Sequence, residues 1–243
     1  MAEVRVYAEA SALARAAAEH FVALAEAAVS ARGRFAVALS GGSTPKAMYA
    51  LLATGEFAAG VNWTRVHVFW GDERCVPPDH PDSNYCTAHE ALLDHVPILA
   101  GNVHRIQGEM EPAGAADEYE RALRSFFASG QPRFDLIMLG MGDDGHTASL
   151  FPGTAAIHEQ KRWVVAHLVS KLSAWRVTLT PVVINAAANV AFVVSGATKA
   201  ERLSQVLTGP YQPDVLPSQI VRPAEGRLLW WVDSAAAAQL KAK

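Results

Sequence analysis

The chain has 243 residues, of which 51% are hydrophobic and 19% are charged, and its formal net charge is −3. This composition is typical of a globular protein and excludes a disordered one, and a chain of this length can bury a large core without disulfides or metals. A chain with this charge has no general basic field, so we expect no nucleic-acid partner, and an anionic ligand needs a local cluster of donors.

Apolar segments typical of strands alternate with helical segments along the chain. The first is a strand over 4–7, followed by a helix over 11–31 that we expect Ser11 to cap and Gly33 to end. Further strands are expected over 35–39, 66–70, 134–140, 164–168, 176–180, 189–196 and 227–232, and helices over 45–53, 84–94, 112–129, 181–188, 197–207 and in the Ala-rich tail. This alternation predicts an α/β fold with a mostly parallel sheet and helices on both faces, a Rossmann-like three-layer sandwich formed by residues 1–243 as a single domain.

Several other features bear on the class of protein. Cys75 and Cys86 lack the spacing of a metal or redox motif, which indicates two reduced thiols in a cytosolic protein. The histidines show no metal-ligand spacing, so no metal site is expected. No apolar run approaches the roughly 20 residues that span a bilayer, and the N-terminal sequence lacks the apolar region of a signal peptide. We therefore expect a cytoplasmic protein with no membrane partner.

Loops at the carboxyl ends of parallel strands are where such sheets bind ligands. The first is the segment SGGSTP, which begins at Ser40. Gly41 and Gly42 allow the backbone to approach a ligand, and we expect Thr44 to cap the following helix. Free N–H groups at a helix start attract phosphate, so Gly41, Gly42, Ser43 and Thr44 are candidate phosphate-binding residues. The alternative is a tight, well-capped turn with no ligand.

Two further strand ends carry charged residues. Asp72, Glu73 and Arg74 follow the strand that ends at Trp70. Arg74 is a candidate for binding phosphate or carboxylate, and Asp72 or Glu73 for binding sugar hydroxyls. The alternative is a solvated loop with internal ion pairs.

Two more cations occur later in the chain. Lys199 lies in the first turn of a helix, where a cation opposes the helix dipole, which favours a partner anion nearby. An exposed lysine without a ligand is the alternative. Arg176 opens another strand and is the second candidate cation.

The most informative loop follows the strand over 134–140. Its sequence GMGDDGHTASLFP presents His146 within a glycine-framed turn, close to Asp143 and Asp144. A histidine takes a proton from water near neutral pH, so His146 is a candidate general base, against the alternative of a structural histidine bonded to backbone. Asp143 is interpreted as a surface acid. No GxSxG motif is present, which argues against a serine hydrolase.

These loops together resemble the 6-phosphogluconolactonase family. The motifs SGGSTP, WGDERCVPPDHPDSNY, FDLIMLGMGDDGHTASLFP and RVTLTPVVINAAANVAFVVSGATKA occur in the order of that family and cover about residues 35–205. The family has an α/β sheet with helices on both sides. The segment 171–175, KLSAW, departs from the family, whose members often carry prolines there.

The resemblance implies hydrolysis of 6-phospho-D-glucono-1,5-lactone to 6-phospho-D-gluconate in the oxidative pentose phosphate pathway, without a cofactor, by a monomer or small homo-oligomer. The partner is then a phosphorylated sugar lactone, a small molecule. His146 is implied as the general base that activates water, with Asp144 orienting it or contacting substrate. Residues implied to bind the sugar phosphate are Gly41, Gly42, Ser43, Thr44, Asp72, Arg74, Arg176 and Lys199, with the division of phosphate contacts among the three cations left open.

Two other functions stay as alternatives. SGGSTP is shared with sugar-phosphate deaminases and isomerases, but deaminases typically carry Asn-Glu-Pro after the histidine motif, where this chain has Ser149-Leu150-Phe151-Pro152. A non-catalytic sugar-phosphate sensor usually has an added DNA-binding domain, and no helix-turn-helix pattern occurs here.

Overall fold

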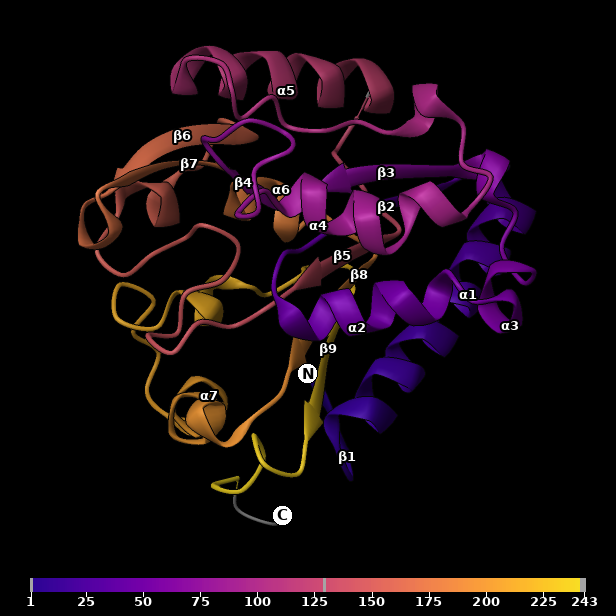
Figure 1. The fold of residues 1–243 in the computed structure, drawn as a ribbon. Coiled ribbons are helices and arrows are strands. Elements are labelled where there is room, and N and C mark those ends of the chain that lie inside the picture. The colour runs from indigo at the N-terminus through magenta and orange to yellow at the C-terminus, as the bar shows by residue number, and fades with distance from the viewer. Residues whose placement is uncertain (1, 129, 241–243) are drawn as a thin grey trace.

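A six-stranded parallel sheet forms the centre of the computed structural model, which describes residues 2–128 and 130–240 (Figure 1). Its strands lie in the order β1-β9-β8-β5-β2-β3, and every neighbouring pair is parallel. The bounds are β1 (Glu3–Tyr7), β2 (Phe35–Leu39), β3 (Val66–Trp70), β5 (Leu136–Leu139), β8 (Asn189–Val194) and β9 (Arg227–Asp233). The predicted α/β class with a mostly parallel sheet is confirmed.

Helices cover both faces of this sheet. They are α1 (Ala10–Arg32), α2 (Ser43–Leu52), α3 (Gly55–Ala58), α4 (Asn84–Ala91), α5 (Pro112–Phe127), α6 (Pro181–Ile184) and α7 (Ala200–Thr208). Neighbouring side chains of β9 show the layering: Trp231 contacts His20 of α1 at 4.9 Å between ring centroids, whereas Trp230 borders the same hollow as Val206 of α7. Successive strand residues point to opposite faces, so α1 and α7 lie on different sides, as a three-layer sandwich requires.

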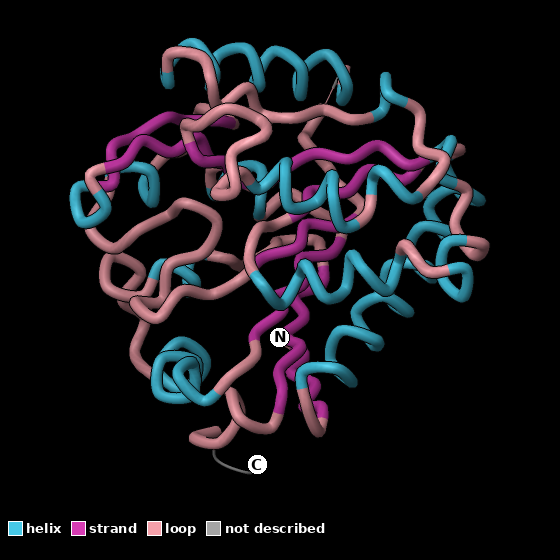
Figure 2. Tube along the Cα trace, viewed as in Figure 1, coloured by secondary structure: helices cyan, strands magenta, loops and turns pink. Residues whose placement is uncertain are grey.

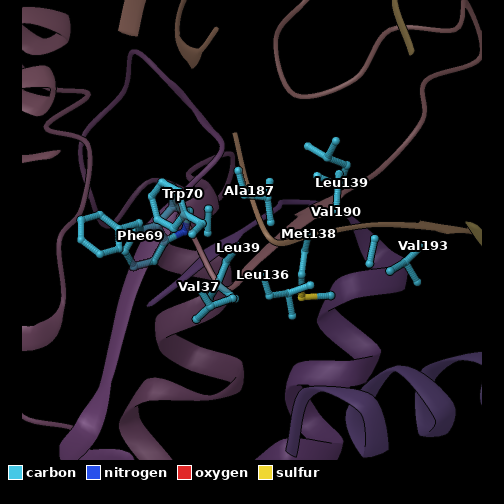
Figure 3. Packing of buried hydrophobic residues seen from close by; sticks show 14 of the residues in the cluster. Val37, Leu39, Phe69, Trp70, Leu136, Met138, Leu139, Ala187, Val190 and Val193 are labelled. Atoms are coloured by element: carbon cyan, nitrogen blue, oxygen red, sulfur yellow. The ribbon is translucent and has the colours of Figure 1, made fainter. Parts of the chain in front are cut away.

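The core lies where the central strands meet (Figure 3). All residues of β2 and β5 are buried, which is why both segments read as uninterrupted apolar runs in the sequence. In register, Val37 lies opposite Leu136, and Met138 lies opposite Ala191 of β8. Burying one such valine or leucine stabilises the fold by about 1.5–3 kcal/mol, so these strands hold the ends of their loops firmly in place.

A second, antiparallel sheet was not predicted. It contains β4 (Asp72–Arg74), β7 (Ala174–Leu179) and β6 (Val164–Val169) in that order, and Figure 2 shows the β6–β7 hairpin apart from the large sheet. Parallel strands need a crossover of about a dozen residues, and only the segment 170–173 joins β6 to β7. That short connection permits only a hairpin.

Some helix ends differ from the predictions. The N-cap of α1 is Glu9, because Ser11 already lies inside the helix and donates to the Glu9 carboxylate. The predicted stop is confirmed, since Gly33 has φ 74° and donates its N–H to Val29. The N-cap of α2 is Gly42, with φ 109°, and Thr44 lies in its first turn.

Other helices are shorter than predicted, or absent. The helix expected over 181–188 ends at Ile184, and 84–94 divides into α4 and a 3-10 turn at Leu93–His95. The Ala-rich tail forms turns over 234–239 instead of the predicted helix, and its residues 241–243 lie outside the described range. Residue 129, the last of the helix predicted over 112–129, also lies outside it, and α5 ends at Phe127. The other 3-10 segments are Trp63–Arg65, Ala100–Asn102, Ala155–His158, Ser170–Leu172, Ala197–Lys199 and Pro217–Ile220. Within the described part of the chain, every helix is too short or too polar to span a bilayer.

The strand order fixes where ligands bind. From β2 the chain crosses to β3 at one edge, then returns to β5 on the other side of β2, and β8 and β9 follow in that direction. The order therefore reverses between β2 and β5, and sheets of this kind bind ligands beyond the carboxyl ends of the strands at such a point. The loops after β2 and β5 contain the glycine-rich turn and His146.

One histidine pair makes the stability of this fold depend on pH. Nδ1 of His67 lies 3.3 Å from Nε2 of His104, whose ring stacks on Phe69. Burial, and next the neighbouring His67, lower the pKa of His104 to about 4, from about 6.5 in an unfolded chain. Between these values only the unfolded chain binds the proton. We expect the free energy of unfolding to be highest above about pH 6.5 and to fall toward pH 4, by up to about 1.4 kcal/mol per pH unit for this group.

Urea unfolding at several pH values measures this slope, and His104→Phe should reduce it. His95→Phe, at an exposed histidine, is the matched control and should leave the slope unchanged. Equal slopes in the wild type and His104→Phe would contradict the assignment.

Candidate functional site

A cavity of about 260 Å³ lies between the loop after β5 and the small sheet. Its ionisable lining residues are Asp72, Arg74, Asp143, Asp144, His146, Lys171 and Arg176. A larger hollow of about 360 Å³ between α7 and β9 is bordered by only one charged residue, Arg222. Acid–base chemistry needs paired titratable groups, so the smaller cavity is the candidate site.

The imidazole of His146 is held by Asp144. Nδ1 of His146 lies 2.6 Å from Oδ1 of Asp144, and the backbone N–H of His146 donates to the same oxygen at 3.2 Å. These bonds to His146, and then the Lys171 ammonium 3.0 Å away, hold the pKa of Asp144 well below its usual range. Because an ionised carboxylate only accepts, Nδ1 carries the proton and Nε2 is left as the basic nitrogen.

Glycines make room for this arrangement. A Cβ on Gly142 would lie 2.0 Å from Nδ1 of His146, so no other residue fits there. Gly145 has φ 82° and donates its N–H to the carbonyl of Gly142, which closes the turn. On its other side, the imidazole stacks on Phe151 with ring centroids 4.1 Å apart. The ring is therefore fixed between a glycine and an aromatic side chain.

Two arginines face the same cavity from the small sheet. Arg74 of β4 and Arg176 of β7 are directly opposite in the antiparallel register. Burial, and next the charge of Arg74, lower the pKa of Arg176. In the described residues neither arginine forms an ion pair with a carboxylate, and their hydrogen bonds go to the carbonyls of Asp82 and Trp175. Like charges in this position destabilise a sheet, so the pair favours an anion between them.

Asp72 also lines the cavity. It is held by Ser149 and Asn84, two residues of the sequence motifs that were not assigned a role. Its Oδ2 accepts from the Ser149 hydroxyl at 2.7 Å, and the Asn84 amide donates to its carbonyl at 2.8 Å. A Cβ on Gly41 would lie 1.8 Å from Oδ1 of Asn84. Gly41 therefore admits the Asn84 side chain, a contact between distant segments that no local pattern reveals.

Glu73 does not line the cavity. Of the two residues considered for binding sugar hydroxyls, Asp72 and Glu73, only Asp72 lies there. The side chain of Glu73 is buried and accepts the N–H groups of Asn84 at 2.7 Å and Tyr85 at 2.8 Å, together with the hydroxyl of Ser83. Burial raises the pKa of Glu73. This carboxylate fixes the start of α4 and the segment that follows Arg74.

The glycine-rich turn and Lys199 lie beside the cavity and do not line it. The Thr44 hydroxyl lies 3.2 Å from that of Ser195, which brings the loops after β2 and β8 together. Lys199 forms an ion pair of 2.6 Å with Asp143, a residue that does line the cavity. The side chain of Asp143 is 74% exposed, as expected of a surface acid, and its ion pair with Lys199 was not predicted. Lys171 is a further lining cation that was missed.

The described residues contain no group of three or more His, Cys, Asp or Glu side chains arranged to hold a metal ion. The chemistry available in the cavity is that of an imidazole base, carboxylates and cations.

Replacing Gly142 tests how the imidazole is held. We expect Gly142→Ala to displace the His146 ring, to remove the downfield NMR signal of its Nδ1 proton, and to cost about 1–3 kcal/mol of stability through overpacking. Gly140→Ala is the matched control, because a Cβ there meets no atom within 4 Å. Retention of the same proton signal in both variants would show that the ring does not depend on Gly142.

Comparison with known proteins shows the family of the chain. The sequence profile described as glucosamine-6-phosphate isomerases/6-phosphogluconolactonase matches residues 8–230. A 6-phosphogluconolactonase of Nostoc sp. is 46% identical over 217 residues, covering 88% of each chain. One of Synechocystis sp. is 41% identical over 218 residues, again 88% of each. The solved structure of 6-phosphogluconolactonase from Trypanosoma brucei has a TM-score of 0.86 and 31% identity, with 99% of each chain covered. The chain therefore belongs to the glucosamine-6-phosphate isomerase/6-phosphogluconolactonase family.

Proposed function

We propose that the protein hydrolyses 6-phospho-D-glucono-1,5-lactone to 6-phospho-D-gluconate, a step of the oxidative pentose phosphate pathway. The observation that carries the proposal is an imidazole base and two arginines without carboxylate partners facing one cavity. The names of the relatives support the same reaction. All these groups come from one chain, and we propose a monomer or small homo-oligomer.

In the proposed mechanism, Nε2 of His146 removes a proton from a water molecule beside the lactone carbonyl. The Asp144 carboxylate accepts the hydrogen bond from Nδ1 and stabilises the imidazolium that forms. Hydroxide adds to the carbonyl carbon, and a tetrahedral oxyanion results. Its collapse expels the ring oxygen, which the imidazolium protonates, so His146 returns to its neutral form. The lactone is already an activated ester, so water can attack its carbonyl carbon directly. No covalent enzyme intermediate is required.

The phosphate is proposed to bind the cations at the far end of the substrate. Arg176 and Arg74 supply charge inside the cavity, while Lys199 and the turn from Gly41 to Thr44 lie at its edge. Anchoring one end of the substrate brings the carbonyl to the imidazole and lowers the entropic cost of the reaction.

A sugar-phosphate deaminase is the nearest rival. In deaminases an Asn-Glu-Pro segment typically follows the histidine motif, whereas here Leu150 stands in that segment and is completely buried, and the neighbouring Ser149 is bonded to Asp72. The segment from Ser149 to Pro152 therefore lacks the glutamate that deaminases carry there. Ammonia release from glucosamine 6-phosphate would support the rival function and contradict the proposal.

We also propose a cytoplasmic location. Cys75 and Cys86 are free, half-buried thiols, which suits a reducing compartment.

His146→Gln tests the base. A positioned base contributes about 10²–10⁴ in rate, so kcat should fall by that factor while the affinity for 6-phosphogluconate is kept. A pH-stat assay on freshly made lactone, corrected for spontaneous hydrolysis, measures the rate. His158→Gln, at an exposed histidine, is the control. Near-normal kcat in His146→Gln would exclude this residue as the base.

Arg176→Gln tests the anion site. A hydrogen bond to a charged group contributes about 1.5–3 kcal/mol, so KM for the phosphorylated lactone should rise about 10- to 100-fold. KM for plain glucono-1,5-lactone should change much less. An equal change for both lactones would mean that Arg176 does not bind the phosphate.

A further inference from the structure

Asp143 provides the only carboxylate that contacts Lys199 in the described part of the chain. Oδ1 of Asp143 lies 2.6 Å from Nζ of Lys199. Asp143 is also one of the residues that line the cavity containing His146. In the free protein, the carboxylate of Asp143 is therefore already paired with Lys199, the cation beside the candidate binding cavity.

We propose that Asp143 is a specificity-determining residue that occupies Lys199 in the free protein and must release it before a phosphate binds there. This inference rests on the proposed function, in which Lys199 contacts the phosphate of the substrate. Asp143 then sets how strongly the protein binds phosphorylated ligands, because each such ligand has to displace an internal carboxylate.

The surroundings of the two side chains suit an exchange of partners. The side chain of Asp143 is 74% exposed, whereas that of Lys199 is 23% exposed. The carboxylate can therefore turn into solvent at small cost, while the ammonium stays near the cavity. An ion pair with so exposed a partner stabilises the free protein only weakly.

The backbone of Asp143 is held separately from its carboxylate. Nε of Arg202 donates to the Asp143 carbonyl at 3.1 Å. Release of the carboxylate thus leaves the loop that carries Asp144 and His146 in place. On the other side, Lys199 follows Ser195, whose hydroxyl lies 3.2 Å from that of Thr44. The loop that carries Lys199 therefore meets the start of α2, where free N–H groups also attract an anion.

Asp143→Asn tests the proposal. The amide removes the competing charge and keeps the size of the side chain. We expect the Kd for inorganic phosphate, measured by calorimetry, and KM for the phosphorylated lactone to fall about two- to fivefold. KM for plain glucono-1,5-lactone should not change. An unchanged or higher Kd for phosphate would overturn the proposal.

Two controls separate the ion pair from the general effect of charge. Asp117 lies on α5 and forms an exposed ion pair with Arg162. Asp117→Asn removes the same charge there and should leave phosphate binding unchanged. In a Lys199→Gln background, Asp143→Asn should no longer improve phosphate binding, because no ammonium remains to be released. Persistence of the full improvement in that background would indicate simple repulsion and would overturn the proposal.

The calorimetric measurement also separates this inference from the proposed function. Tighter phosphate binding by Asp143→Asn in a protein that does not hydrolyse the lactone would contradict the proposed function alone. Normal lactone hydrolysis without any change in phosphate binding would contradict the role of Asp143 alone.

Discussion

The hydrogen bond from Nδ1 of His146 to Asp144 decides which ring nitrogen is basic, and the loop after β5 has the shape that this bond requires. Gly142 leaves space for the ring, and Phe151 closes the opposite face. The strand before the loop is completely buried, so the loop that carries the imidazole begins in the core of the molecule. Preorganisation of this kind removes the need to order the base during each turnover.

The charges that we propose to bind the substrate come from a different part of the fold. Arg74 and Arg176 come from the antiparallel sheet, which connects to the large one through the N–H of Leu179 donated to the carbonyl of Gly71. Two guanidinium groups held opposite each other without carboxylates cost stability in the empty protein. In the proposed function, an anion that binds between the two arginines offsets that cost. The repulsion in the free protein therefore adds to the affinity for the anion.

Much of the fold could be predicted from the sequence, since buried parallel strands are continuous apolar runs and the glycine-framed His146 stands at the end of one. The small sheet was missed, although the short link between β6 and β7 permits only a hairpin. Other contacts join different segments of the chain. Asn84 lies against Gly41, Lys171 pairs with Asp144, and Glu73 turns inward to accept the N–H of Asn84. No periodicity records such contacts. Thr44 failed as a cap because Gly42, with φ 109°, already begins the helix.

The division of the cavity between two sheets has a consequence for local opening. The tip of the β6–β7 hairpin carries Lys171 and exposes Leu172, and Leu168 and Trp175 lie opposite each other on its strands and are also exposed. Few buried side chains hold this tip, so its amide protons should exchange with solvent long before those of the buried strand β5. We expect such an opening to break the contact between Lys171 and Asp144 and to leave the imidazole in place, because His146 follows the buried strand β5. The wall of the cavity and the proposed base therefore depend on different sheets of one small chain.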